Sequence, residues 1–327
     1  SEELNSKGYQ IEALDDGYDK NREKEILDNA NKTVEKRTEA ALDLYEKENP
    51  ELFHVTYTAL DRIQHYFPLE GESSEVSNHY KKLDEALGNL KSEVDNDSTI
   101  IVMSDHGFEP LETEIYLNHW MKEQGYLETK KSESFLGKLG ITQQRVVPVL
   151  RNLGLLDIAK DAMKLIGFEA DKSVPQPTMN DINLDKTKAY AGNYGGGIYL
   201  VESNIDDSEA FKKQLTEELR SLKVNGESPF KFVKSSEEVY SSQSSESPDI
   251  VTSTKPGRLV VGFLGQGRLY SKNTEKSGKH SLNGIIATNN NQLDVSDANI
   301  TEVAPTALEL LEEDIPDHMT GKSLIVK

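Results

Sequence analysis

Two short segments place acidic and imidazole side chains close together. In one, Asp105 and His106 follow the apolar run 99–103 after a single serine, so they lie at the end of an expected buried strand. In the other, Asp61 and His65 are four residues apart, and a helical turn would project both side chains from one face. Carboxylate oxygen and imidazole nitrogen are both ligands for cations such as zinc. These residue types therefore suggest a metal site.

A third candidate ligand, His280, lies in a glycine-flanked loop that opens into the apolar run 284–287. A lone loop histidine is usually solvated, and an isolated Asp-x-x-x-His pair is more often a surface hydrogen bond than a metal site. Taken together, the three segments are stronger evidence for a metal site, because each leads into or out of an expected sheet strand. We therefore treat them as one candidate site.

Helical and strand patterns alternate over the first third of the chain. Apolar residues recur at helical spacing over 21–48 and over 80–94. Strands are expected at 52–57 and 99–103, with a turn or short helix over 61–67. The order helix, strand, helix, strand is typical of a parallel sheet covered by helices, so we predict an α/β fold.

The pattern changes in the middle of the chain, where polar, lysine-rich sequence precedes a stretch with helical spacing at 146–166. This change predicts a mainly helical insertion on the sheet. We expect 1–120 to be the first part of a metal-binding domain, 121–186 a helical cap-like insertion, and 187–327 the second part of that domain. The later elements are expected to be strands at 189–191, 197–201, 230–233 and 258–263, and a helix at 207–222.

The composition narrows the classes of function. The chain has 327 residues, enough to bury a sizeable core, and its 37 basic against 57 acidic residues give a net charge of -20. Such a charge repels nucleic-acid phosphates and anionic lipids, so we expect no binding to a nucleic-acid duplex or a membrane. Because the chain has no cysteine, any metal must be held by carboxylates and imidazoles.

Further segments follow in a recognisable order. Residues 58–67 read Thr-Ala-Leu-Asp-Arg-Ile-Gln-His-Tyr-Phe, and residues 104–108 read Ser-Asp-His-Gly-Phe. The later segments are 116–120, 237–240 with 248–250, 278–285, and 303–306 with 319–324. Together they resemble the type I phosphodiesterase/nucleotide pyrophosphatase family of the alkaline phosphatase superfamily, from about residue 52 to residue 327. One such segment would be unspecific, but six in the right order are specific.

The resemblance implies a fold and a set of ligands. The fold would be alkaline-phosphatase-like, with a mixed or mostly parallel sheet sandwiched by helices. Two adjacent divalent cations, usually zinc, would be bound. The first would be held by Asp61, His65 and His280, and Asp105 and His106 would contribute to the second, with Gln64 and Ser104 orienting ligands through hydrogen bonds.

The resemblance also implies an activity, the hydrolysis of phosphodiester or nucleotide pyrophosphate bonds in a small substrate. In the complete protein, a metal-activated hydroxyl would attack phosphorus and form a covalent phospho-enzyme, which metal-activated water would release. The main enzymatic alternatives, a phosphomonoesterase, a sulfatase and a phosphoglycerate mutase, share the superfamily, and the fold does not separate them. A metal-binding pseudoenzyme or interaction module would need only the ligands.

One departure from the family concerns the start of the chain. The family normally opens with a strand that ends in a metal-binding Asp, followed by a Thr or Ser nucleophile. We find neither in residues 1–50, where 11–16 is the closest imitation. Because the chain starts at Ser1 rather than Met, we favour a fragment that is poorly stable and catalytically weak. The alternatives are a degenerate member that binds metal without catalysis, and a nucleophile from elsewhere.

The remaining histidines receive less specific interpretations. We expect His54 to be buried on the strand 52–57, and His79 and His318 to be solvated or to cap helices. His119 stays open between a structural role and a substrate contact. The longest apolar stretches of about six residues are far short of the roughly 20 that cross a bilayer, and no signal peptide is recognisable. The expected location is therefore cytoplasmic; the sequence does not indicate the oligomeric state.

Overall fold

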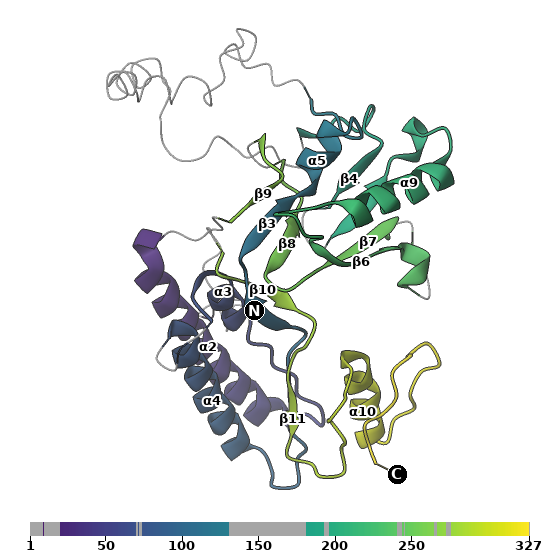
Figure 1. The fold of residues 1–327 in the computed structure, drawn as a ribbon. Coiled ribbons are helices and arrows are strands. Elements are labelled where there is room, and N and C mark those ends of the chain that lie inside the picture. Colours follow the sequence, from purple (N-terminus) through teal and green to yellow (C-terminus); the bar gives the residue numbers. More distant parts are fainter. Residues whose placement is uncertain are drawn as a thin grey trace, which may run out of the picture. The chain divides into compact units, whose positions relative to one another are not determined.

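A computed structural model describes Tyr9 and residues 20–69, 71, 74–130, 181–192, 196–240, 244, 246–264, 267–272 and 276–326. These residues form a mixed α/β structure with several sheets (Figure 1). The chain divides into two compact units. Unit 1 comprises residues 1–112 and 273–327, and unit 2 comprises residues 113–272. Among the described helices, none combines the length and the apolar character that a bilayer crossing requires.

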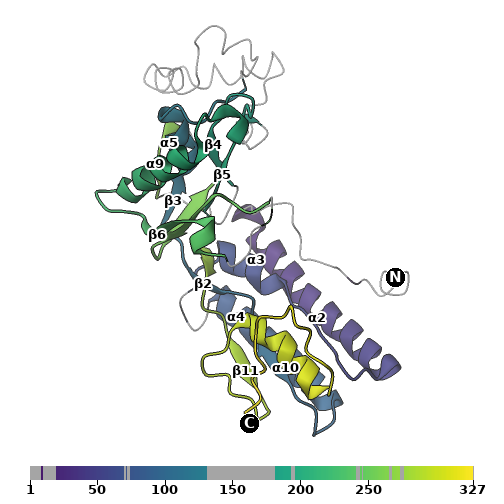
Figure 2. The ribbon, with the colours of Figure 1, turned by 90° about the vertical axis from the view of Figure 1, so that its right-hand side faces the viewer.

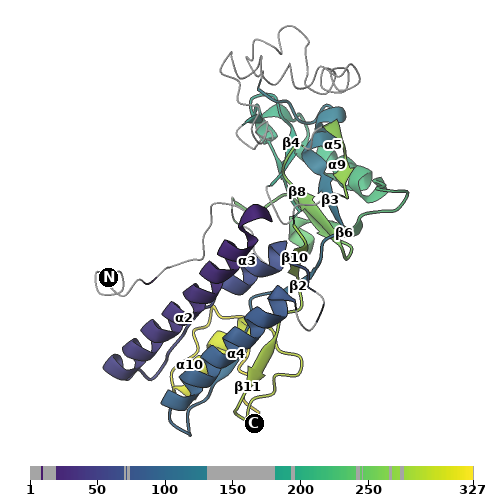
Figure 3. The ribbon, with the colours of Figure 1, turned by 90° about the vertical axis from the view of Figure 1, so that its left-hand side faces the viewer.

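Three helices form the core of unit 1: α2 (Glu23–Glu48), α3 (Ala59–Tyr66) and α4 (Glu75–Glu93). They pack against one another, and α2 and α4 run side by side (Figure 3). A short 3₁₀ turn, η1 (Lys20–Arg22), precedes α2. The buried apolar side chains that they share are Ala30, Val34, Ala59, Ile63, Phe67, Val76 and Ala86. The helices predicted over 21–48 and 80–94 are confirmed, and the segment after Thr58 is a helix.

The predicted strand at 52–57 is wrong. The segment is extended, but it pairs with no strand in the described part of the chain. Side chains of α2 bind it instead: Arg37 Nη1 donates to the carbonyl oxygen of Thr56, and the hydroxyls of Thr38 and Tyr57 lie 2.8 Å apart. His54 is therefore exposed rather than buried.

Two short antiparallel strand pairs complete the part of unit 1 that bears the candidate ligands. Strand β1 (Ile101–Met103) pairs with β11 (Ile286–Thr288). Strand β2 (Gly107–Pro110) pairs with β10 (Gly278–Ser281). The C-terminal part adds η6 (Ile300–Glu302) and α10 (Val303–Leu310).

The described residues of unit 2 form two sheets, visible in Figures 1 and 2. In the three-stranded sheet, β3 (Thr113–Tyr116) lies between β8 (Arg258–Val261) and β9 (Tyr270–Ser271). The four-stranded sheet has the order β4-β5-β7-β6, with strands at Ala189–Ala191, Gly197–Leu200, Ile250–Thr254 and Phe230–Ser235. The helical elements in the described part of this unit are α5 (Leu117–Glu123), η3 (Glu202–Asn204), α9 (Ser208–Ser221) and η4 (Ser236–Glu238). Helix α9 packs on β6 and α5 contacts β4.

The 116–120 segment has a structural role in unit 2. The fully buried Asn118 donates from Nδ2 to the carbonyl oxygens of Ala191 and Gly262, and its Oδ1 accepts from the backbone N–H of Ala191. One side chain thus joins α5 to the end of β4 and to the residue after β8. Nε2 of the neighbouring His119 lies 3.3 Å from Oε1 of Glu123.

A mostly parallel sheet is not confirmed. Within the described strands, β3 and β8 are parallel, whereas the other named pairs are antiparallel. The predicted strands at 189–191, 197–201, 230–233 and 258–263 and the helix at 207–222 are confirmed within a few residues. The segment 146–166 lies outside the described residues, so the helical insertion and the three-part division stay predictions.

The sequence suggested that His79 is solvated or caps a helix, but its side chain is buried within α4, only 1% exposed. Its Nδ1 lies 3.0 Å from Oδ1 of Asn31 on α2, and its Nε2 has no hydrogen-bond partner among the described residues. Burial lowers the pKa of His79 from 6.5 to about 4, because the charged imidazolium loses its hydration inside the core.

This pKa predicts acid-dependent stability. Since the unfolded chain takes up the proton more readily, the contribution of His79 is complete above pH 6.5 and is lost as the pH falls from 6.5 toward 4. The full loss is about 3 kcal/mol of the free energy of unfolding. Urea titrations between pH 8 and pH 4 should show a shallower decline for His79→Gln than for the wild type. The control Val76→Ala should lower stability equally at both pH values; parallel curves for His79→Gln and the wild type would contradict the prediction.

Candidate metal centre

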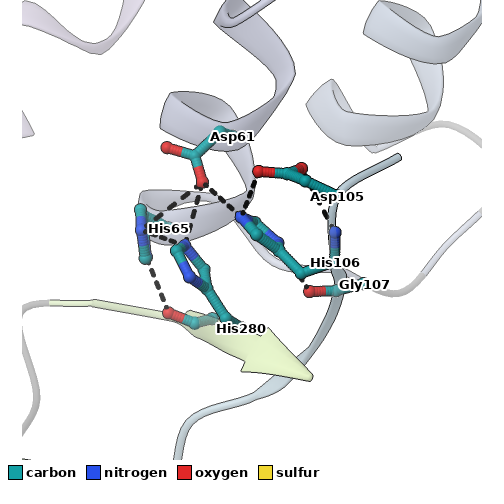
Figure 4. A network of polar contacts seen from close by, with 7 residues as sticks. Asp61, His65, Asp105, His106, Gly107 and His280 are labelled. Carbon is teal, nitrogen blue, oxygen red and sulfur yellow. Dashed lines mark hydrogen bonds and ion pairs between the residues drawn. The ribbon is translucent and has the colours of Figure 1, made fainter. Parts of the chain in front are cut away.

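Three candidate ligands converge in unit 1. Asp61 and His65 extend from α3, and His280 extends from β10 (Figure 4). One ligand atom from each lies within 4.8 Å of the others. The two shortest distances among them involve His280 Nε2, which lies 3.0 Å from Asp61 Oδ1 and 3.2 Å from His65 Nε2. A carboxylate and two imidazoles that meet in this way are a donor set suited to zinc.

The other two candidate ligands lie in the turn between β1 and β2. His106 Nε2 is 3.9 Å from Asp61 Oδ1 and 3.5 Å from Asp105 Oδ2. The ring of His106 stacks on that of His280, with the centroids 3.7 Å apart. The structure therefore brings all five predicted ligand residues together, although they come from three distant stretches of the sequence. Asp105 and His280 are exposed and the other three are half-buried.

Close backbone packing holds α3 against β10. The backbone N–H of Ser277 donates to the carbonyl oxygen of His65 at 2.7 Å, and its hydroxyl donates to that of Tyr66 at 2.9 Å. A Cβ on Gly278 would lie 2.2 Å from the carbonyl oxygen of Gln64, so glycine permits this approach. His65 and His280 meet because these two elements touch.

Backbone carbonyls select the tautomers of two imidazoles. His65 Nδ1 lies 3.1 Å from the oxygen of Gly278, and His106 Nδ1 lies 3.2 Å from that of Gly107. Because a carbonyl oxygen only accepts hydrogen bonds, Nδ1 carries the proton in both rings. In the neutral rings each Nε2 then carries the lone pair that a metal would bind; Nε2 of His65 lies near His280 and Asp61, and Nε2 of His106 lies near Asp105 and Asp61. Such Nδ1–H to carbonyl bonds are common in histidines that bind metals.

Burial favours the neutral form of two of the candidate ligands, His65 and His280. The pKa of His65 is lowered chiefly by burial, which outweighs the opposing hydrogen bond to Gly278. Burial likewise lowers the pKa of His280, with the positive charge of His106 as the next cause. Neutral imidazole is the form that coordinates a metal, so less competition from protons is expected near neutral pH.

Gln64 and Ser104 bind groups other than the candidate ligands. Gln64 Nε2 donates to the hydroxyl of Tyr80 at 3.3 Å. Ser104 exchanges two hydrogen bonds with Ile285: its Oγ accepts from the backbone N–H at 2.9 Å, and its own N–H donates to the carbonyl at 3.0 Å. Ser104 thereby ties the ligand-bearing turn to the segment after β10. The predicted role of both residues in orienting ligands stays a prediction.

Sequence reasoning missed two contributors to the centre, Gly278 and Phe108. Both lie within segments that resemble the family, and the glycine two residues before His280 was the available signal for close packing. The position of Phe108 opposite His280 depends on the β2–β10 register, which the sequence does not reveal.

Comparison with known proteins identifies the family. A model described as type I phosphodiesterase / nucleotide pyrophosphatase matches residues 5–283. No curated protein and no solved structure matches the chain. The matched region includes all the residues of the candidate centre. The chain therefore belongs to the type I phosphodiesterase/nucleotide pyrophosphatase family.

Proposed function

We propose that this chain provides the metal ligands of a hydrolase that cleaves phosphodiester or nucleotide pyrophosphate bonds. Asp61, His65 and His280 would hold one divalent cation, and Asp105 and His106 would contribute to an adjacent one, with zinc the expected ion. The observation that carries the proposal is the convergence of the first three residues within 4.8 Å. Membership of a family of hydrolases supports it.

The protein's own residues prepare this chemistry. Bound cations would supply Lewis-acid stabilisation of the oxygens around phosphorus and lower the pKa of the attacking group. His65 and His106 keep Nδ1 protonated on backbone carbonyls and present Nε2 to the centre. The carboxylate of Asp61, within 4 Å of three imidazoles, offsets the cationic charge that would gather there.

The expected substrate is a small phosphodiester or nucleotide. A chain with net charge -20 repels an anionic substrate, so cations at the centre would provide the local attraction. The nucleophile is expected to lie outside the five ligand residues. An alkaline-phosphatase-like arrangement with a mainly helical insertion is the fold that we propose.

Metal analysis tests the proposal. The wild type, His280→Ala and the control His54→Ala, which removes an exposed histidine of unit 1, should be dialysed against zinc and measured for bound metal. We expect zinc in the wild type and the control, and a loss of about 100-fold in affinity for His280→Ala. Equal zinc content in all three would contradict the metal centre.

Hydrolysis of bis(p-nitrophenyl) phosphate then separates the two functional hypotheses. Any zinc-dependent turnover should disappear in His280→Ala and persist in His54→Ala. Zinc uptake without turnover would instead favour the metal-binding pseudoenzyme.

A further inference from the structure

One aromatic side chain contacts three of the candidate ligands. The ring centroid of Phe108 lies 5.0 Å from that of His65, 5.0 Å from that of His280 and 5.6 Å from that of His106. The planes are inclined by 77°, 72° and 57°, so the contacts are edge-to-face or tilted rather than stacked. These are favourable geometries for aromatic rings.

The three imidazoles have no other common neighbour of this kind among the described ring contacts. His65 comes from α3, His106 from the turn before β2, and His280 from β10. Phe108 is the register partner of His280 in the β2–β10 pair. Its ring therefore contacts imidazoles from three segments of the chain.

The strand pair that carries Phe108 is itself anchored. The next register pair is Lys279 with Glu109, whose Nζ and Oε1 atoms lie 2.7 Å apart. Lys279 is 8% exposed, so this ion pair is largely shielded from water. Beyond it, Leu111 N–H donates to the oxygen of Ser277 at 2.8 Å. The backbone on either side of Phe108 is thus held in register, and the ring has a fixed base.

A fixed ring matters because a metal site must hold its ligands before the metal arrives. Imidazoles that rotate freely about χ1 and χ2 lose that freedom on binding, and the loss weakens affinity. A ring that contacts all three imidazoles removes part of this loss in advance. Hydrogen-bond partners of metal ligands, which also donate no ligand atom, commonly change metal affinity by about 10- to 100-fold, and we expect an effect of this size from the ring.

We infer that Phe108 is a positioning residue that preorganises His65, His106 and His280 for metal binding. The inference rests on the proposed metal centre and adds a residue that donates no ligand atom. A purely structural Phe108 would affect the stability of the metal-free protein, whereas a positioning residue also affects the geometry and affinity of the bound metal.

The test compares Phe108→Leu, Phe108→Met and Phe108→Tyr with the wild type and with Phe53→Leu. Phe53 is the matched control, a half-buried phenylalanine of unit 1 with an edge-to-face contact to Tyr45 at 5.5 Å. Zinc affinity is measured by competition with a chromophoric chelator. The visible absorption of the Co²⁺-loaded protein reports ligand geometry, and urea titration of the metal-free protein reports stability.

We expect zinc affinity to fall about 10- to 100-fold in Phe108→Leu and Phe108→Met, with weaker and shifted Co²⁺ bands. Phe108→Tyr, which keeps the ring, should restore both properties, and Phe53→Leu should change neither. Wild-type affinity and spectrum in Phe108→Leu would overturn the inference while leaving the metal centre intact. Unfolding of both the Leu and Met variants would make the ring structural and would also overturn it. Absence of zinc binding in the wild type would overturn the proposed function itself.

Discussion

Asp61→Asn is expected to weaken zinc binding by at least about 100-fold and to abolish any zinc-dependent phosphodiester hydrolysis. The Oδ1 atom of Asp61 lies 3.0 Å from His280 Nε2, 3.8 Å from His65 Nε2 and 3.9 Å from His106 Nε2. It is therefore the atom that all three imidazoles face. If a zinc site contributes about 12 kcal/mol over four ligands, one ligand accounts for about 3 kcal/mol, which is a factor of about 100.

The substitution is nearly isosteric, so the fold should persist and the loss should be electrostatic. The control is Asp84→Asn, which removes the same charge from an exposed position on α4. Zinc affinity of both variants is measured by chelator competition, and turnover with bis(p-nitrophenyl) phosphate. Equal zinc affinity in Asp61→Asn and Asp84→Asn would exclude Asp61 as a ligand.

Gly278→Ala is expected to lower the free energy of unfolding by about 3 kcal/mol and to weaken zinc binding with it. The added Cβ would lie 2.2 Å from the carbonyl oxygen of Gln64 and 3.2 Å from the Phe108 ring. The closer neighbour is backbone of α3, which cannot rotate away as a side chain would. Helix α3 must then shift relative to β10, and Asp61 and His65 move with it.

Gly88→Ala is the matched control: it makes the same chemical change, but it is expected to raise rather than lower the free energy of unfolding. Gly88 is exposed within α4, and a Cβ there meets nothing within 4 Å. Alanine should therefore stabilise the helix by about 0.5–1 kcal/mol and leave zinc affinity unchanged. Urea titration of metal-free and zinc-loaded protein measures both variants. A Gly278→Ala protein as stable as Gly88→Ala would contradict the close packing of α3 on β10.

The ligand residues were predictable because their spacing is local. Asp61 and His65 share one helical face, and Asp105 and His106 are adjacent, so each pair could be recognised without knowledge of the fold. His280 was different: only its resemblance to a family segment connected it to residues more than 170 positions earlier. The contacts of Phe108 could not be predicted, because they depend on strand register over a comparable separation.

Two errors have a common physical origin in tertiary packing. The apolar stripe predicted for the second helix began at Tyr80, whereas the buried positions in α4 include Val76, His79 and Ala86. His79 is three residues after Val76 and seven before Ala86, so helical spacing puts all three on one face. A histidine is nevertheless rarely assigned to a core. The 52–57 segment likewise has the residue types of a strand, yet Arg37 and Thr38 on α2 bind its polar groups.

The order of the chain through the two units has an evolutionary consequence. Unit 1 is interrupted after Glu112 and resumes at Asn273. The chain segments that leave and re-enter this unit are held together by the register pair Pro110–Gly278 and the Leu111–Ser277 hydrogen bond. Closing a longer loop costs little additional entropy, about 0.6 kcal/mol for each doubling of its length. Insertions, deletions and replacement of segments within residues 113–272 can therefore accumulate with little penalty to the ligand geometry.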